Sequence, residues 1–417
     1  MRRRLFRSLA ALLLLGLAAP APFATAVSVS ADPPPAAFRR VDAAVQGGIL
    51  KGLYPGAVVV VGRHDRVLYR AAYGRTTWSR SAPKPTVGGS LWDIASLTKV
   101  VGTASAAARL VDRDSLLLDA PVSRYLPAFG TGDKSRVTVR MLLDHTSGLP
   151  PYLPFHRMAK SRARAVDLLL AEPLRRTPGD TAVYSDLNAL VMGLVLERAA
   201  GLPLESVVTR QVLRPLGLRD TRFRPTRALA PRIVPSAMSG GRPLRGVNDL
   251  NAVAFGGVAG HAGLFSTGSD LARFAQTWLR LGNVPARSST SSGGSATRSG
   301  TGSVGTAARR WVDSVTIRSF LAPGSPRAGT RLLGWDTRDT LRADPDEPSV
   351  FGSRLTSAAY GHTGWTGVQI WIDPGYDLFL VFLTNRSFAP RTRNSLEDLR
   401  EVRAAVADAV VDAAAVR

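Results

Sequence analysis

The sequence lacks cysteine altogether. This absence excludes disulfide bonds and lipid attachment to a cysteine, so the fold has to be held by its own hydrophobic core. The chain is long enough to build one, because it has 417 residues and 45% of them are hydrophobic. That length exceeds the usual range of one compact domain and predicts one large two-lobed unit or two domains.

Long apolar runs are absent beyond the N-terminal segment. That segment has a basic start at residues 2–7, an apolar stretch at residues 9–19 and a small-residue cleavage site at residues 24–26. The apolar stretch is too short for a membrane anchor, and this order of features is typical of a secretory signal peptide. We expect residues 1–26 to be removed, residues 27–36 to form a linker, and the mature protein to be secreted without a transmembrane segment.

Acidic residues are few: 31 stand against 54 basic residues, which gives a formal charge of +23. The first 26 residues contain four arginines and no acidic residue, so their removal leaves +19. Such a surface favours anionic partners, but the arginines are scattered and no nucleic-acid motif with interleaved aromatics is present. We expect a small-molecule or peptide substrate, an anionic cell-wall polymer as a further partner, and no nucleic acid.

Two common catalytic patterns are missing as well. No Gly-x-Ser-x-Gly occurs, which argues against a hydrolase with a nucleophile elbow. The five histidines do not form a metal-binding spacing such as His-Glu-x-x-His. We therefore expect neither a metal ion nor a cofactor.

Hydrophobic periodicity places strands at both ends of the chain and helices in the middle. The simplest packing joins two hairpins in one antiparallel sheet flanked by the terminal helices, beside a mostly helical lobe. The predicted fold class is therefore α/β, of the α+β type. The patterns indicate hairpins at residues 55–73 and 367–384, helices at 36–53, 186–200, 269–281 and 395–417, and a glycine-rich loop at 251–267.

The predicted domain covers residues 37–417. We expect its sheet lobe at about residues 37–90 and 330–417 and its helical lobe at about residues 91–329. Residues 286–308 consist almost wholly of Ser, Thr, Gly, Ala and Arg, so they cannot bury apolar area and are expected to form a disordered insertion.

Ser96 and Lys99 form a Ser-x-x-Lys pattern just before the small, apolar residues 100–112. That stretch predicts a buried helix with Ser96 in its first turn and Lys99 on the same face. An amine in a dry site has a lowered pKa and can then act as the base for a serine nucleophile. The pattern alone also arises by chance, but lysine is scarce here and this one begins the helix.

Two further motifs carry candidate chemistry. Tyr184 stands at a predicted helix start, where it could shuttle a proton beside a lysine, or simply pack there with Asp186 as the helix cap. The second motif, His362-Thr363-Gly364, precedes a strand. A protonated His362 would attract a carboxylate and Gly364 would let a ligand approach the strand, although a loop histidine and a turn glycine explain the same residues.

Taken in order, Ser96-x-x-Lys99, Tyr184-x-Asp186 and His362-Thr-Gly364 resemble the penicillin-recognising serine hydrolases. The nearer branch holds class C β-lactamases, D,D-carboxypeptidases and esterases. Residues 144–150, 257–266 and 361–367 are similar to that group too, and the resemblance covers residues 37–415 apart from the insertion. It implies a β-lactamase/transpeptidase-like fold.

The resemblance also implies roles. Ser96 would form an acyl-enzyme, and Lys99 and Tyr184 would move protons. Asp186, His362, Thr363, Gly364 and Trp365 would bind substrate, with the oxyanion between the backbone N–H groups of Ser96 and Trp365.

Two departures from the family pattern qualify the expected function. His362 replaces the usual lysine, which weakens a β-lactamase assignment. Asp186 replaces the usual asparagine and would keep Lys99 charged. The expected activity is D,D-carboxypeptidase-like hydrolysis of wall peptides. The alternatives are a small-ester hydrolase, a β-lactamase, or a poorly catalytic module that binds penicillin or peptidoglycan.

Overall fold

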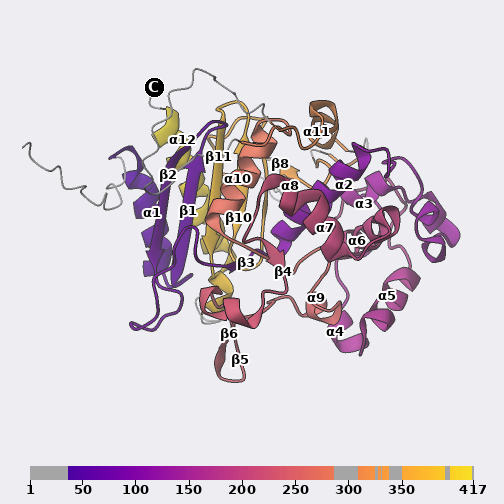
Figure 1. The fold of residues 1–417 in the computed structure, drawn as a ribbon, viewed down its shortest axis with the longest axis horizontal. Helices are drawn as coiled ribbons and strands as arrows, with labels where there is room; N and C mark the ends of the chain where they lie inside the picture. The colour runs from indigo at the N-terminus through magenta and orange to yellow at the C-terminus, as the bar shows by residue number, and fades with distance from the viewer. Residues whose placement is uncertain are drawn as a thin grey trace, which may run out of the picture. The chain divides into compact units, whose positions relative to one another are not determined.

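The central sheet is built from the two ends of the chain. The computed structural model describes residues 36–285, 309–324, 327–329, 331–337, 350–389 and 395–415. Six antiparallel strands follow the order β2-β1-β11-β10-β9-β8 (Figure 1). Their bounds are β1 Gly56–Gly62, β2 Val67–Gly74, β8 Asp336–Thr337, β9 Tyr360–Thr363, β10 Gln369–Asp373 and β11 Leu378–Thr384.

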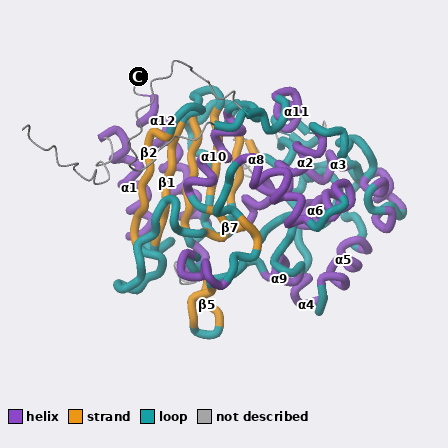
Figure 2. The backbone as a smooth tube through the Cα atoms, viewed as in Figure 1, coloured by secondary structure: helices purple, strands orange, loops and turns teal. Residues whose placement is uncertain are grey.

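Both faces of this sheet are covered, because every residue of β1 is buried. Val59 and Val61 belong to the core cluster that includes side chains of α1 (Arg39–Leu50) and α12 (Leu396–Ala415). Val58 and Val60 belong to the cluster that includes side chains of α10 (Gly268–Leu279). Figure 2 shows α10 in front of the strands, with α1 and α12 on the side of β1 and β2 away from the helical region. The expected sheet with flanking terminal helices is confirmed.

The middle of the chain is mostly helical. Its helices are α2 Ser105–Val111, α3 Val139–Leu143, α4 Phe155–Met158, α5 Arg162–Ala171, α6 Asp186–Ala200, α7 Leu204–Val208, α8 Arg214–Leu216, α9 Leu250–Ala254 and α11 Ser314–Phe320. Two small sheets accompany them: β3 (Trp92–Asp93), β7 (Leu264–Ser266) and β4 (Arg222–Phe223), then β5 (Ala237–Ser239) and β6 (Arg242–Leu244).

The helix α6 has the predicted bounds, 186–200. Ten consecutive residues from Leu187 to Leu196 are buried, so all its faces are packed in the protein interior. It ends at Gly201, whose φ of 63° suits a glycine cap. Among the described residues no single helix passes a length and hydropathy test for a membrane span, whereas the bent pair Asp186–Ala200 and Leu204–Leu216 passes it together.

Two expectations about local structure are wrong in part. The glycine-rich residues 251–267 contain most of α9 and the strand β7, because Asp249 caps α9 through Ala252 N and β7 pairs with both β3 and β4. The helix expected after Ser96 begins as a π-helix, Lys99–Ala104, before α2. The predicted insertion 286–308 and the predicted signal peptide and linker up to residue 35 lie outside the described residues.

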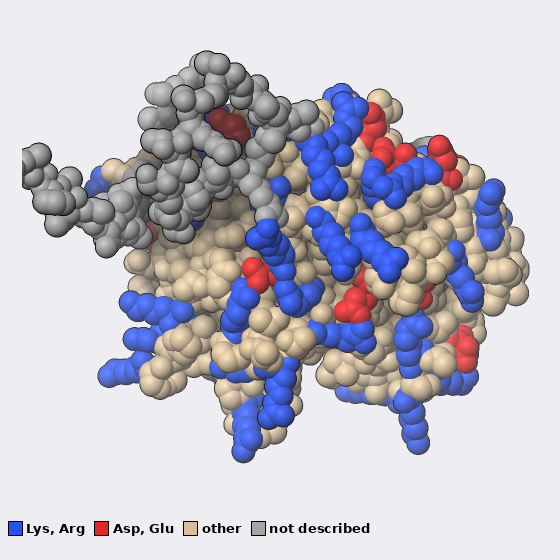
Figure 3. Space-filling model, viewed as in Figure 1, with Lys and Arg blue, Asp and Glu red and all other residues tan. Residues whose placement is uncertain are grey.

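Basic side chains are spread over the molecular surface. Figure 3 shows lysine and arginine across the whole visible face, with fewer acidic side chains between them. The view agrees with the scattered arginines of the sequence and does not single out one basic groove.

Candidate active site

Ser96 is held by a strained turn. It lies in a 3₁₀ turn, Ala95–Leu97, directly after β3. Ala95 has a φ of 44°, which is unfavourable for a residue with a side chain. Asp93 stabilises this conformation, because its Oδ1 accepts a hydrogen bond from Ala95 N at 2.9 Å. These contacts hold the backbone around Ser96 in one conformation.

Asp93 also joins this turn to two other segments. Its Oδ2 accepts from Asn248 N at 2.7 Å, and its backbone carbonyl accepts from Thr366 Oγ1 at 2.8 Å. Burial raises the pKa of Asp93 to about 6, although the hydrogen bonds from backbone N–H groups oppose the rise. The Asp93 carboxyl group thus ties the Ser96 turn to the loop before α9, and the Asp93 backbone carbonyl ties it to the loop after β9.

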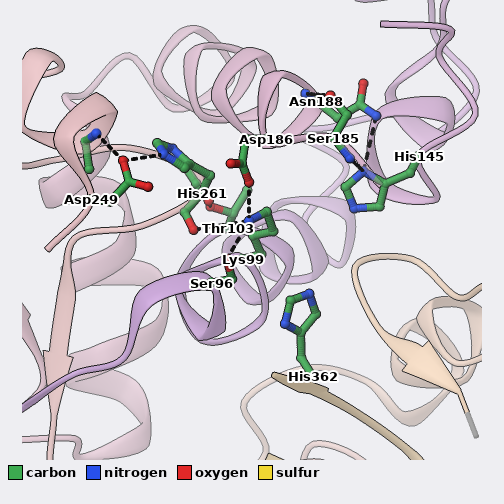
Figure 4. A network of polar contacts seen from close by, with 12 residues as sticks. Ser96, Lys99, Thr103, His145, Ser185, Asp186, Asn188, Asp249, His261 and His362 are labelled. Carbon is green, nitrogen blue, oxygen red and sulfur yellow. Dashed lines mark hydrogen bonds and ion pairs between the residues drawn. The ribbon is translucent and has the colours of Figure 1, made fainter. Parts of the chain in front are cut away.

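Lys99 contacts both Ser96 and Asp186 (Figure 4). Its Nζ lies 3.0 Å from Ser96 Oγ and 2.8 Å from Asp186 Oδ1, and it donates a longer bond of 3.4 Å to the His261 carbonyl. The Lys99 side chain is only 4% exposed, and that of Asp186 is 21% exposed. The predicted serine, amine and carboxylate therefore meet in one largely buried cluster.

The pKa of Lys99 is raised, contrary to the expected lowering by a dry site. Burial is the largest single influence and would lower it, but the interactions with Asp186 and Tyr184 together outweigh burial. The pKa of Asp186 is lowered: burial would raise it, but the charges of Lys99 and His261 prevail. Both directions describe an ammonium–carboxylate pair, as the hypothesis about Asp186 requires.

Tyr184 lies against Lys99, whose Nζ is 4.8 Å from the centre of the tyrosine ring. The rings of His145 and His362 flank it at 4.9 and 5.8 Å. Desolvation raises the pKa of Tyr184 more than the charge of Lys99 lowers it, so the expected lowering is wrong. The helix cap is Ser185, whose hydroxyl accepts from the Asn188 backbone N–H of α6 at 3.3 Å, and not Asp186.

His362 is buried in β9 and is not a ready cation. Its Nδ1 lies 2.7 Å from the Thr363 carbonyl, so Nδ1 must carry the hydrogen. Burial lowers the pKa of His362 more than Asp336, 3.9 Å from its Nε2, raises it. The expectation that a protonated His362 attracts a substrate carboxylate is therefore wrong, because the buried imidazole favours its neutral form.

Gly364 brings the end of β9 against the Ser96 turn. A Cβ at Gly364 would lie 2.9 Å from the Ile94 carbonyl, so only glycine fits without displacement. The next residue, Trp365, is 57% exposed, and the guanidinium of Arg386 lies 4.6 Å from its ring centre. The segments that carry the Trp365 and Ser96 N–H groups are thus adjacent, and their role as oxyanion donors stays a prediction.

One charged residue beside Tyr184 was not foreseen from the sequence. The guanidinium of Arg331 lies 5.5 Å from the Tyr184 ring centre and forms a buried ion pair with Asp336. Arginine is abundant and scattered in this sequence, so composition and spacing could not single out this one. Arg331 provides a second cation at the site, next to the neutral His362.

Asp249 and His261 were also missed as site residues. His261 Nε2 lies 3.0 Å from Asp249 Oδ1, and one ligand atom each of Asp186, Asp249 and His261 lie within 4.8 Å of one another. Such a group could in principle hold a metal ion, but Lys99 already donates to Asp186, and His261 and Ala252 N donate to Asp249. The three residues form part of a hydrogen-bonded ion-pair network instead.

A serine whose hydroxyl contacts a buried lysine, beside a tyrosine and against the end of strand β9, is the arrangement of a serine hydrolase. The sequence comparison agrees: the chain belongs to the Beta-lactamase family, whose model matches residues 39–405. Membership confirms the resemblance and the β-lactamase/transpeptidase-like fold class.

Relatives with assigned names fall in the same group. The chain is 30% identical to the N-acetylmuramyl-L-alanine amidase of Bacillus subtilis (strain 168), over 85% of this chain and 82% of that one. It is 28% identical to an Escherichia coli (strain K12) protein whose name assigns it as a D-alanyl-D-alanine carboxypeptidase, over 81% and 80%. A solved penicillin-binding protein homologue from Caulobacter crescentus shares the fold, with 18% identity, coverage of 90% and 98%, and a TM-score of 0.65.

Proposed function

We propose that this hydrolase cleaves an amide bond of peptidoglycan, namely the bond between N-acetylmuramic acid and L-alanine. The observation that carries the proposal is the pairing of charge around Tyr184. Both cations over its ring have an aspartate partner: Lys99 pairs with Asp186, and Arg331 pairs with Asp336. The similarity to the amidase of Bacillus subtilis supports the same substrate.

Charge pairing matters because two candidate amide bonds of peptidoglycan, the muramyl–L-alanine bond and the D-alanyl–D-alanine bond, differ in their leaving groups. The leaving group of a D-alanyl-D-alanine peptide carries a free carboxylate one carbon from the scissile nitrogen. Burying that carboxylate requires an available cation. The L-alanine of a muramyl peptide has its own carboxyl group in the next peptide bond, so no charge lies beside the scissile amide. A site with paired cations favours this neutral leaving group.

The reaction proceeds through an ester of Ser96. In the enzyme form in which the Lys99–Tyr184 pair has lost one proton, Ser96 Oγ attacks the amide carbonyl carbon and that pair accepts the Ser96 proton. The oxyanion forms against the adjacent backbone N–H groups of Ser96 and Trp365. The C–N bond then breaks as the departing nitrogen receives a proton from the same pair. Water repeats the sequence on the acyl-Ser96 ester and releases the free acid.

D-alanyl-D-alanine carboxypeptidase activity is the second candidate. Its support is the similarity to the Escherichia coli relative and the geometry of Arg331. The ion pair with Asp336 uses one Nη of Arg331, and a guanidinium has further N–H groups that could receive a terminal carboxylate. The two candidates differ in which bond is cut, so one assay separates them.

The test is mass-spectrometric analysis of products from four substrates: an N-acetylmuramyl-L-alanyl peptide, an acyl-D-Ala-D-Ala peptide, nitrocefin and short-chain p-nitrophenyl esters. We expect release of a peptide with a free L-alanine amino group, at a kcat/KM at least about tenfold above that for D-alanine release, which corresponds to about 1.4 kcal/mol. Release of D-alanine with an intact muramyl amide would favour the second candidate, and turnover of nitrocefin or esters alone would contradict both.

We also propose that the enzyme works outside the cytoplasm. The support is the signal-peptide pattern of residues 1–26 and the high positive charge, which suits retention by anionic wall polymers. We expect protein recovered from the culture medium or wall fraction to begin at Val27, as measured by intact mass, and to be released from isolated walls by salt. Full-length protein confined to the cytoplasmic fraction would contradict this proposal.

A further inference from the structure

Asp249 and His261 form a hydrogen-bonded pair beside Asp186, in which the His261 side chain is buried and that of Asp249 is 33% exposed. Figure 4 shows His261 between Asp249 and Asp186, with Lys99 next along the cluster. The His261 side chain is 1% exposed, and its Nε2 must donate to Asp249 Oδ1, because a carboxylate oxygen only accepts. None of the chemical steps above uses this pair.

The pair anchors a loop that touches the catalytic lysine. The carbonyl of His261 accepts the 3.4 Å bond from Lys99, and the neighbouring Gly260 carbonyl accepts from Thr103 Oγ1 at 2.6 Å. Asp249 is anchored in turn, because the same Oδ1 accepts from Ala252 N at 2.7 Å as the cap of α9. The position of the loop beside Lys99 therefore depends on the Asp249–His261 bond.

The pair also contributes charge next to the Lys99–Asp186 ion pair. Atoms of Asp249 and His261 lie within 4.8 Å of an Asp186 oxygen. The charge of Asp249 opposes part of the lowering of the Asp186 pKa, and His261, with a smaller contribution from Lys99, lowers the pKa of Asp249 to about 2. Because electrostatic interaction is mutual, the ionised Asp249 stabilises the protonated form of Lys99.

We propose that Asp249 and His261 are positioning residues of this hydrolase, which hold the loop against Lys99 and set the charge of the Lys99–Asp186 pair. The inference depends on Ser96 acting as the nucleophile but not on the identity of the wall substrate. The groups that interact electrostatically with Lys99 come from several elements and are Tyr184, Asp186, Asp249, His145 and His362, with His261 acting through Asp186.

The Asp249→Asn variant tests whether the negative charge of Asp249 raises the pKa of Lys99. Asparagine keeps an acceptor for Ala252 N and caps a helix as well as aspartate does, so this change removes charge and leaves the anchor. With one fewer carboxylate near Lys99, its pKa falls, and the base is available at lower pH. We expect the pH–rate profile for labelling of Ser96 by a fluorophosphonate to move to lower pH by about one pH unit, the lower end of the range for a nearby charge.

The matched control is Asp313→Asn. Asp313 caps α11 through Val315 N at 2.8 Å, so it undergoes the same chemical change at the same kind of helix position. The pH–rate profile of Asp313→Asn for labelling of Ser96 should superimpose on that of the wild type. A superimposed profile for Asp249→Asn as well would overturn the assignment of charge control. The fluorophosphonate reacts without a wall substrate, so this result is independent of the muramyl-peptide assay.

Variants of His261 test whether the His261–Asp249 hydrogen bond holds the loop against Lys99. His261→Ala removes the donor to Asp249 and frees the loop, and a misplacement of about 1 Å at a catalytic group can cost roughly a hundredfold in rate. We expect labelling of Ser96 to slow by about 10- to 100-fold in His261→Ala and to recover most of that loss in His261→Gln, whose amide N–H can reach Asp249. Thermal unfolding is measured for both variants. Equal loss of rate in the two, at equal melting temperature, would overturn the positioning role.

Discussion

Ser96→Ala is expected to abolish covalent labelling by a fluorophosphonate and by a labelled penicillin, and to reduce amide hydrolysis by at least about a thousandfold. The reason is that the variant retains binding and any oxyanion donors but has no atom that can form the acyl ester. The Lys99–Asp186 pair loses only a hydroxyl contact, because Lys99 keeps its 2.8 Å bond to Asp186. The fold should therefore survive, which thermal unfolding can establish on the same sample.

Ser79→Ala, a substitution of an exposed serine, is the matched control for Ser96→Ala. The Ser79 hydroxyl pairs at the surface with the neighbouring Ser81, and its removal should change neither labelling nor turnover. Residual labelling of Ser96→Ala at another position, with retained turnover, would contradict Ser96 as the nucleophile. This comparison also tests the alternative of a binding module, because such a module would bind penicillin without hydrolysing the muramyl peptide or the D-Ala-D-Ala peptide.

The architecture was predictable because hydrophobic patterns report burial directly. The valine run of β1 and the hairpin residues 367–384 predicted strands with covered faces, and both lie in one sheet. The last helix was expected at residues 395–417, and the hydroxyl of Ser395 accepts from Asp398 N at 3.1 Å at its start. The local sequence was enough to predict these elements, because the pattern of hydrophobic residues in each indicates which face is buried.

The site was predictable as a set of residues but not as a set of charges. The family resemblance implied that Ser96, Lys99, Tyr184 and His362 share one site, and the structure places them together. The pKa values of Tyr184 and His362 differ from expectation, whereas that of Lys99 follows the effect expected of Asp186 and not the lowering expected of a dry site; each depends on neighbours distant in sequence. Burial raises the pKa of Tyr184 and lowers that of His362, and Asp186 raises that of Lys99.

Arg331, Asp249 and His261 could not be found from the sequence for a related reason. Each acts through a partner: Arg331 through Asp336, and Asp249 with His261. The two pairs have different separations, five residues for Arg331 with Asp336 and 12 for Asp249 with His261, and neither separation is a recognisable sequence pattern. His261 stood in a stretch similar to the family, yet only its contact with Asp249 distinguishes it from a structural histidine.

Asp186→Asn is expected to move the pH–rate profile for labelling of Ser96 to lower pH by about one to three pH units, the usual effect of a directly paired charge. Asp186 stabilises charged Lys99, so its removal lowers the pKa of Lys99 and supplies the neutral amine at lower pH. Asp186 also raises the pKa of Tyr184, so its removal moves that group in the same direction. The shift of the profile is therefore to lower pH whether Lys99 or Tyr184 accepts the Ser96 proton.

The measurement is the rate of fluorophosphonate labelling from about pH 5 to about pH 10, a range that spans the ordinary pKa values of histidine, tyrosine and lysine, with Asp119→Asn as the control. Asp119 forms an exposed pair with Arg140, and its removal should leave the profile unchanged. On the rising limb, a profile displaced by about one pH unit makes Asp186→Asn react roughly tenfold faster than the wild type at the same pH. A displacement to higher pH would instead show that Asp186 itself receives the proton from Lys99, and an unchanged profile would show that the ion pair does not control the base.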